Sequence, residues 1–201
     1  MRIASQGILN QDTEITFYFD SKPYKGFLGD TVASALLAND VHLVGRSFKY
    51  HRPRGILGIG SEEPNALISV HKGGRVEPNV RATVQEIYQG LIVTSQNSWP
   101  NLKFDALAIN DIAARFLSAG FYYKTFMWPP RFWEALYEPI IRRAAGLGRL
   151  DSKTDDDNYD QNFLFCDLLI IGGGPSGLLS ALLTARAGLD VILVDENANF
   201  G

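Results

Sequence analysis

A glycine motif that follows a short apolar run most constrains what this chain can fold into. The run is Leu168 to Ile171, and it has the length and composition of a strand buried on both faces. Gly172, Gly174 and Gly177 follow it with the spacing G-x-G-x-x-G. In this pattern the first glycine permits a tight turn, the second lets a pyrophosphate approach the backbone, and the third lets the next helix pack against the strand. The motif therefore predicts a strand, a glycine turn and a helix.

The residues after the motif complete the pattern. A helix is predicted over Ser176 to Ala187, with Gly188 at the position of a left-handed C-cap. A second buried strand is predicted over Val191 to Val194, and Asp195 follows it about 20 residues after the turn, where a carboxylate can bind ribose hydroxyls. We therefore predict a site for the adenosine diphosphate part of a dinucleotide. Its candidate residues are Gly172, Gly173, Gly174, Pro175, Ser176, Gly177, Asp195 and Glu196.

The chemistry of this site favours an unphosphorylated dinucleotide. The pyrophosphate would lie over the helix N-terminus, whose dipole is positive, and Asp195 would repel the 2′-phosphate of NADP. The alternative is a glycine turn that binds no nucleotide. A membrane span is excluded because the glycines and Pro175 interrupt the apolar residues and leave a run shorter than the roughly 18 that a span needs.

The composition is that of an ordinary globular protein. The 201 residues are 46% hydrophobic and 20% charged, and the net charge of -3 with scattered basic residues argues against nucleic-acid binding. Cys166, the single cysteine, excludes a disulfide framework and any site built from several thiolates, and we expect it to be an inert core thiol. The N-terminus lacks an apolar secretory segment, so a cytoplasmic location is expected. Because one strand–helix–strand unit cannot cover both faces of a parallel sheet, we expect a longer protein.

The first hundred residues predict a small sheet crossed by one helix. Glu14 to Asp20 alternates between polar and apolar residues, Tyr24 to Leu28 can return beside it, and residues 1–13 show no clear period. Asp30 and Thr31 are good N-caps for a helix of about ten residues that starts at Val32. This order opens a β-grasp fold, as in plant-type ferredoxins. Further short strands are predicted over 66–70, 81–84 and 91–94, with a hairpin turn at 72–75.

A connector with unusual composition follows. Helical segments are predicted over 104–112 and 112–119, and an aromatic tract covers 120–133. A helix over 132–145 would be kinked by Pro139. The aromatic residues beside several arginines indicate either a surface for another subunit or domain, or internal packing. An acidic linker, Asp151 to Asp160, leads to the glycine motif.

The remaining candidates for chemistry are weak. His42, His51 and His71 lack the spacing of metal ligands, and no nucleophile–base pair stands out. We expect His42 to be half-buried and His71 to lie at a strand end. His51 lies beside Arg52 and Arg54 in a loop that could meet a phosphate or carboxylate, although such loops more often stay solvated or form ion pairs.

The segment from Pro53 to Gly55 carries a resemblance to ferredoxin-like domains. Relatives of that kind place cysteines with the spacing C-x4-C-x2-C after a Pro-Arg-Gly and bind a two-iron cluster. Those positions are Gly58, Glu63 and Ala66 here, and none supplies a thiolate. The resemblance therefore implies a ferredoxin fold without its cluster. Glu62 and Glu63 are interpreted as structural replacements rather than as an acid–base pair.

Two further segments resemble the alpha subunits of heterotetrameric sarcosine oxidases. They are Glu-Glu-Pro-Asn-Ala at 62–66 and Phe-Tyr-Tyr-Lys-Thr-Phe-Met-Trp-Pro at 121–129. Taken over the whole chain, the resemblance implies the N-terminal portion of such a subunit, with an α+β part followed by an α/β part. It implies a cluster-free ferredoxin-like β-grasp domain at 1–97, a helical and aromatic connector at 98–160, and the first β-α-β unit of a Rossmann-type FAD/NAD-binding domain at 161–201.

The resemblance also implies a function. Such enzymes oxidise sarcosine with oxygen to glycine and hydrogen peroxide, and pass the one-carbon unit to tetrahydrofolate. The alpha subunit holds NAD at the glycine motif, with FAD as the alternative ligand, and the beta subunit contributes FAD and most of the FMN site. Gamma and delta subunits complete the assembly. No catalytic residue is expected in this chain, and we expect it to be inactive alone.

Two alternatives stay open. One is the alpha subunit of a related FAD-dependent dehydrogenase for proline or an opine, or of a glycine-oxidising cyanide synthase. The absent cysteines count against it, because such relatives commonly keep the cluster. The other is a non-enzymatic fragment that docks onto partner subunits without holding a nucleotide.

Overall fold

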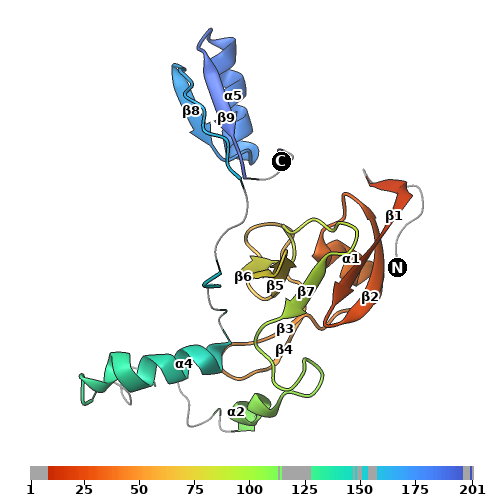
Figure 1. Cartoon of the computed structure of the whole chain (residues 1–201), viewed down its shortest axis with the longest axis vertical. Coiled ribbons are helices and arrows are strands. Elements are labelled where there is room, and N and C mark those ends of the chain that lie inside the picture. The colour runs from red at the N-terminus through yellow and green to blue at the C-terminus, as the bar shows by residue number, and fades with distance from the viewer. Residues whose placement is uncertain are drawn as a thin grey trace. The chain divides into compact units, whose positions relative to one another are not determined.

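The computed structural model describes residues 9–112, 114, 128–146, 148, 151–153, 158–196 and 200. The chain divides into two compact units, Met1–Asp155 and Asp156–Gly201. The first contains a mixed sheet packed against one helix, followed by the short helices of the connector, and the second contains a single strand–helix–strand unit (Figure 1). None of the described helices is long and apolar enough to cross a bilayer.

The sheet of the first unit has five strands in the order β2-β1-β7-β5-β6. β1 pairs with β2 in an antiparallel hairpin and with β7 in parallel, and β5 pairs antiparallel with β6 and β7. Two-residue strands β3 and β4 form a separate pair. The bounds are β1 (Asn10–Phe19), β2 (Lys22–Leu28), β3 (Gly45–Arg46), β4 (Pro53–Arg54), β5 (Leu67–Lys72), β6 (Arg75–Arg81) and β7 (Ile92–Ser95).

The core of this unit lies between the sheet and α1 (Val32–Ala38). Phe17 is fully buried near the C-terminal end of β1, in agreement with the predicted alternation, and burial of such a side chain contributes about 1.5–3 kcal/mol. Thr31 is the N-cap, because its Oγ1 accepts a hydrogen bond from the Ser34 N–H at 3.2 Å and its own N–H donates to Ser34 Oγ at 3.0 Å. This reciprocal pair fixes where the helix begins. α1 has seven residues and is shorter than predicted.

Two predictions for this unit need correction. No strand covers 81–84; β6 ends at Arg81, and the Val84 N–H donates to the Arg81 carbonyl in a turn. β1 begins at Asn10, inside a stretch predicted to lack regular structure, with an irregular register between Asn10 and Glu14. Pairing with β2 therefore extends the strand beyond its alternating part.

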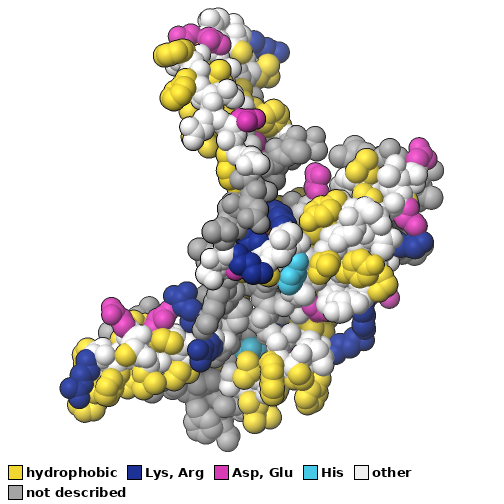
Figure 2. Space-filling model, viewed as in Figure 1, with side chains coloured by type: hydrophobic (Ala, Val, Ile, Leu, Met, Phe, Trp, Pro, Cys, Tyr) yellow, Lys and Arg dark blue, Asp and Glu magenta, His cyan; other side chains and the backbone are white. Residues whose placement is uncertain are grey.

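The connector contains short helical pieces. They are the 3-10 turn η1 (Ala106–Ala108), α2 (Ile109–Ile112), the π-helical turn η3 (Trp133–Tyr137) and α4 (Glu138–Ala145). Pro139 lies in the first turn of α4, where the N–H that proline lacks is not needed for a hydrogen bond within the helix. The predicted helix is therefore a π-helical turn before the proline and an α-helix from there on. Residues 120–127 of the aromatic tract, and all of the predicted helical segment at 112–119 except residues 112 and 114, lie outside the described residues. The described side chains Trp128, Leu136 and Ile140 are exposed, and apolar atoms line α4 in Figure 2.

The second unit consists of β8 (Leu168–Ile171), α5 (Pro175–Arg186) and β9 (Val191–Val194), with β8 and β9 paired in parallel. Both strands have the predicted bounds, and Gly188 has the predicted left-handed conformation, with φ of 90°. The predicted burial on both faces is wrong for this structure, because Leu169 and Ile171 are 54% and 81% exposed. α5 alone can cover only one face of a two-stranded sheet.

Candidate functional site

The three glycines of the motif have separate geometric roles in the second unit. Gly172 has φ of 105°, a conformation that other residues adopt only under strain. A Cβ on Gly177 would collide with the Gly172 carbonyl oxygen, so the helix approaches the turn closely only because Gly177 has no side chain. A Cβ on Gly174 would meet no atom within 4 Å. The turn is therefore closely packed on the helix side and open at Gly174.

The N-terminus of α5 begins at this open position. Gly174 is the N-cap, no side chain among the described residues caps the helix, and its first turn holds no acidic residue. Pro175 has no N–H to offer, so the next available donors are the N–H groups of Ser176 and Gly177. Uncapped N–H groups and the positive end of the helix dipole together attract an anion.

Asp195 lies beside the turn although it is 22 residues from Gly173 in the sequence. Its Oδ2 accepts a hydrogen bond from the Gly173 N–H at 2.6 Å. The structure thus brings the predicted carboxylate to the predicted turn, and Glu196 follows as an exposed residue. The nucleotide-binding roles of all eight candidate residues stay predictions.

The basic loop that contains His51, Arg52 and Arg54 is not arranged as the predicted contact for a phosphate or carboxylate ligand. His51 is fully buried, and its Nδ1 lies 2.6 Å from Asp105 Oδ2, which is buried as well. Arg52 forms an ion pair with Asp111 at 2.7 Å, and this hydrogen-bonded carboxylate raises the pKa of the arginine. For Arg52 the ion-pair alternative is therefore confirmed, and His51 is hydrogen-bonded inside the protein rather than solvated. Arg54 is half-buried in β4.

The other candidates lie in separate parts of the chain. His42 is exposed rather than half-buried, and its Nε2 lies 2.9 Å from Asp40 Oδ1. His71 lies near the end of β5, within 3.2 Å of Thr94 Oγ1. Cys166 precedes β8 and is only half-buried, so the prediction of a core thiol is wrong. Within the described parts of the chain, no three His, Cys, Asp or Glu side chains are placed to hold a metal ion.

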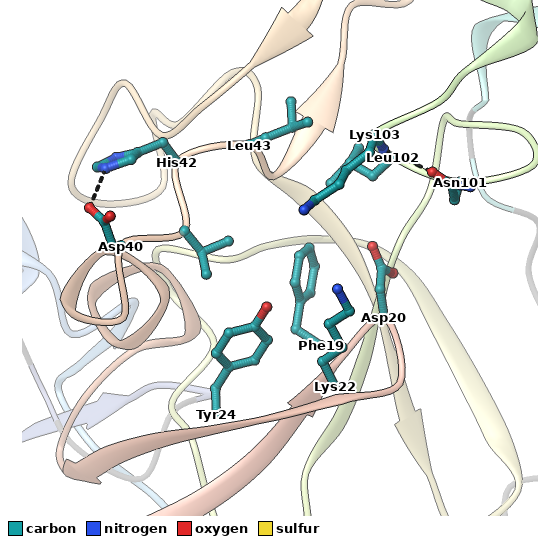
Figure 3. A pocket seen from close by; sticks show the side chains of 11 residues that line it. Phe19, Asp20, Lys22, Tyr24, Asp40, His42, Leu43, Asn101, Leu102 and Lys103 are labelled. Carbon is teal, nitrogen blue, oxygen red and sulfur yellow. Dashed lines mark hydrogen bonds and ion pairs between the residues drawn. The ribbon is translucent and has the colours of Figure 1, made fainter.

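A pocket of about 520 Å³, which no sequence pattern predicts, opens on the first unit. Figure 3 shows Lys22 and Tyr24 reaching toward its centre, while the His42–Asp40 pair lies at its rim. Asp20 is already engaged, because it accepts hydrogen bonds from the Ser95 N–H and hydroxyl. The lining comes from three separate segments and comprises Phe19, Asp20, Lys22, Tyr24, Asp40, Val41, His42, Leu43, Asn101, Leu102 and Lys103.

Comparison with known proteins finds a similar protein family for each of the two units. A family model described as a 2Fe-2S iron-sulfur cluster binding domain matches residues 12–98, and one described as an FAD binding domain matches 165–200. Over 98% of its length the chain is 58% identical to sarcosine oxidase subunit alpha of Rhizobium meliloti (strain 1021). Over 96% it is 31% identical to the same subunit of Corynebacterium sp. (strain U-96). The resemblance to the N-terminal portion of sarcosine oxidase alpha subunits is confirmed.

The chain spans only 20% and 15% of the lengths of these two alpha subunits. A solved structure of L-proline dehydrogenase from P. horikoshii is 18% identical, with a TM-score of 0.46 over 96% of this chain and 26% of that one. The family matches fit an α+β fold. The match at the glycine motif supports FAD, which the sequence analysis kept as the alternative, whereas NAD stays a prediction.

The residues of the first unit do not fit the iron–sulfur cluster that its family description implies. Two-iron clusters are held by cysteine thiolates, with histidine as the known replacement. The three positions aligned with cluster ligands are Gly58, Glu63 and Ala66, and the only cysteine of the chain lies in the second unit. The donor set required for the cluster is therefore missing.

Proposed function

We propose that the glycine turn of the second unit binds the adenosine diphosphate part of a dinucleotide in the alpha subunit of a flavin-dependent, sarcosine-oxidising enzyme. The observation that carries the proposal is the turn itself, which is open at Gly174 and lies beside both an uncapped helix N-terminus and the Asp195 carboxylate. The 58% identity to a sarcosine oxidase alpha subunit supports the enzyme class.

Each part of the turn has one task in this proposal. The N–H groups of Ser176 and Gly177 bind the pyrophosphate, and the bare Gly174 lets it come near the backbone. Asp195 accepts hydrogen bonds from the ribose hydroxyls. When bound, the dinucleotide supplies hydride-transfer chemistry. The chain's own residues bind and orient the nucleotide, and we assign none of them to catalysis.

The wider setting is part of the same proposal. The parent enzyme would convert sarcosine, oxygen and tetrahydrofolate into glycine, hydrogen peroxide and methylenetetrahydrofolate. Its beta, gamma and delta subunits would surround the alpha subunit, with FMN and FAD in or beside the partner. In this interpretation residues 1–97 form the cluster-free ferredoxin-like domain, 98–160 the connector, and 161–201 the start of a Rossmann-type domain in a cytoplasmic protein.

Calorimetric titration of the full-length subunit with NAD and with FAD tests the ligand. Tight binding of NAD supports the assignment made from the sequence, and tight binding of FAD supports the match to FAD-binding domains. Binding of neither would contradict the proposal and favour a subunit that only docks onto its partners.

Substitution of Gly174 tests the site. Because a Cβ there meets no protein atom within 4 Å, Gly174→Ala should leave the fold intact and obstruct the pyrophosphate. We expect at least a tenfold loss of affinity, about 1.4 kcal/mol. Ser180→Ala, at an exposed position farther along α5, is the matched control and should bind normally. Unchanged affinity in Gly174→Ala would show that the nucleotide binds elsewhere.

A further inference from the structure

The Glu63 side chain is buried in the loop of residues 57–66, with 1% of its surface exposed. Four backbone N–H groups point at its carboxylate. Oε2 accepts hydrogen bonds from Leu57 at 2.7 Å and Gly58 at 2.5 Å, and Oε1 accepts from Asn65 at 2.8 Å and Ala66 at 3.2 Å. Successive N–H groups arranged in this way form a concavity that binds an anion.

These hydrogen bonds keep the carboxylate charged. Burial raises the pKa of Glu63, but the backbone N–H groups of the loop together lower it more, so its pKa lies below the ordinary value for a glutamic acid. In the described residues no ion pair to a basic side chain involves this carboxylate. Arg81 instead donates its Nε–H to the Glu63 carbonyl oxygen. The backbone of the loop is therefore the main counterpart of the charge.

Apolar burial holds the loop only at its end, where Ala66 belongs to the core. Leu57 and Ile59 are 75% and 93% exposed, so their side chains contribute little to a core. The N–H of Leu57, in contrast, donates inward to the carboxylate. A buried N–H without a partner costs about 1–3 kcal/mol. The Glu63 carboxylate removes that cost at Ala66 and gives an acceptor to three part-buried N–H groups.

The carboxylate lies among the cluster-ligand positions and is bound by the backbone of two of them. Gly58, Glu63 and Ala66 are those positions in the aligned spacing. A Cβ on Gly58 would lie 3.2 Å from Glu62 Oε1 and 3.3 Å from both the Cα and the N of Glu63, so the Gly58 position faces the backbone of residue 63. The N–H groups of Gly58 and Ala66 donate to opposite oxygens of the carboxylate. In iron–sulfur proteins such N–H groups donate to the sulfurs of the anionic cluster.

We infer that the Glu63 carboxylate takes the place of the iron–sulfur cluster as the internal anion around which the loop of residues 57–66 folds. One glutamate side chain supplies the negative charge and the hydrogen-bond acceptors that the loop requires. The site is thus occupied by a residue of the protein itself. The first unit therefore keeps the loop of a cluster-binding domain without the cluster. This inference does not depend on the nucleotide site.

Thermal unfolding of the full-length protein tests the role of the charge. Glu63→Gln keeps the shape of the side chain but turns one acceptor into a donor that faces backbone N–H groups. We expect the melting temperature to fall by roughly 5–10 °C. Glu62→Gln is the matched control, because Glu62 is exposed and accepts hydrogen bonds from Ile59 and Gly60 in the same loop. Equal shifts for the two variants would contradict the inference.

An added anion tests the site more directly. Glu63→Ala removes the equivalent of one acetate ion, so acetate should bind in the vacated space and raise the melting temperature of this variant by several degrees through mass action. Neutral acetamide and equimolar chloride should not. Wild type and Glu62→Ala should show no such specific response. A shift common to all variants would mean that the loop is not an anion site.

Reconstitution tests the exclusion of the cluster in the wild-type protein, independently of any variant. After anaerobic incubation with iron and sulfide, followed by desalting, we expect no stoichiometric iron and no visible absorption of a two-iron centre. Retention of two irons and two sulfides per chain would overturn the inference.

Discussion

The glycine turn at 172–177 and the loop at 57–66 both direct backbone N–H groups toward a place for an anion, but they differ in what fills it. The loop receives a buried carboxylate from its own sequence, and four N–H groups are satisfied by Glu63. The helix after the glycine turn has no capping side chain and no acid in its first turn. An anion position that the chain fills with its own side chain stabilises the fold, whereas an anion position that stays open can bind a ligand.

α1 shows that an uncapped N-terminus is not a general property of the helices in this protein. Its N-terminus is closed by Thr31 and Ser34, which exchange hydrogen bonds in a capping box. α5 has Gly174 at the corresponding position, with an extended ψ of -179° and no side chain. A glycine there leaves the N–H groups of the helix to an external partner.

The largest effect is expected when the closed side of the glycine turn is disrupted. In Gly177→Ala the new methyl group collides with the Gly172 carbonyl oxygen, so α5 must move away from β8. We expect a loss of about 3 kcal/mol or more in unfolding free energy and complete loss of bound nucleotide. Thermal unfolding and nucleotide content of the full-length protein measure both. Native-like stability would show that the helix does not pack as closely as described.

Filling the open side should separate stability from binding. Gly174→Ser introduces a good N-cap at an extended position, and its hydroxyl can accept a hydrogen bond from the first turn of α5. We expect a gain of a few tenths of a kcal/mol in stability and a roughly 100-fold loss of nucleotide affinity, about 2.7 kcal/mol. Calorimetry and chemical unfolding on the same samples check this. Unchanged affinity would contradict the idea that an open turn is what the ligand needs.

Acid should weaken the loop that is filled by Glu63. Because its pKa is lowered in the folded state, the carboxylate stabilises the fold above the unfolded-state pKa of about 4.3. This stabilisation should decline as pH falls from there through the lower folded-state pKa. Unfolding free energies between pH 6 and the onset of acid unfolding measure it, with Glu63→Gln as the control that lacks this component. Parallel pH profiles for the two proteins would argue against a charged Glu63.

The smallest effect is expected at the closed helix N-terminus of the first unit. Thr31→Ala removes the acceptor for the Ser34 N–H and should cost about 1 kcal/mol of unfolding free energy. Nucleotide affinity should stay unchanged, since Thr31 lies in the first unit. Thr13→Ala, at an exposed position of β1, is the control and should change stability by less than about 0.5 kcal/mol. Equal stability of the two variants would show that the capping box does not stabilise the start of α1.

Prediction from sequence succeeded where structure follows from local pattern. The bounds of β8 and β9 follow from four-residue apolar runs, and the conformation of Gly188 follows from its place after a helix. It failed where distant residues meet. The sequence leaves open whether the loop of His51 meets an anion, stays solvated or forms ion pairs, but Asp105, 54 residues later, lies against its ring inside the protein. The pocket lined by Phe19, His42 and Lys103 was missed for the same reason.

The sequence alone determined that the second unit is a strand, a glycine turn, a helix and a strand, and that the first unit lacks the thiolates for an iron–sulfur cluster. Both conclusions need only residue types and their spacing. Only the tertiary structure decided what takes the place of the cluster. A glutamate at a cysteine position could point anywhere, and the backbone path of residues 57–66 alone places four N–H groups around the carboxylate of Glu63.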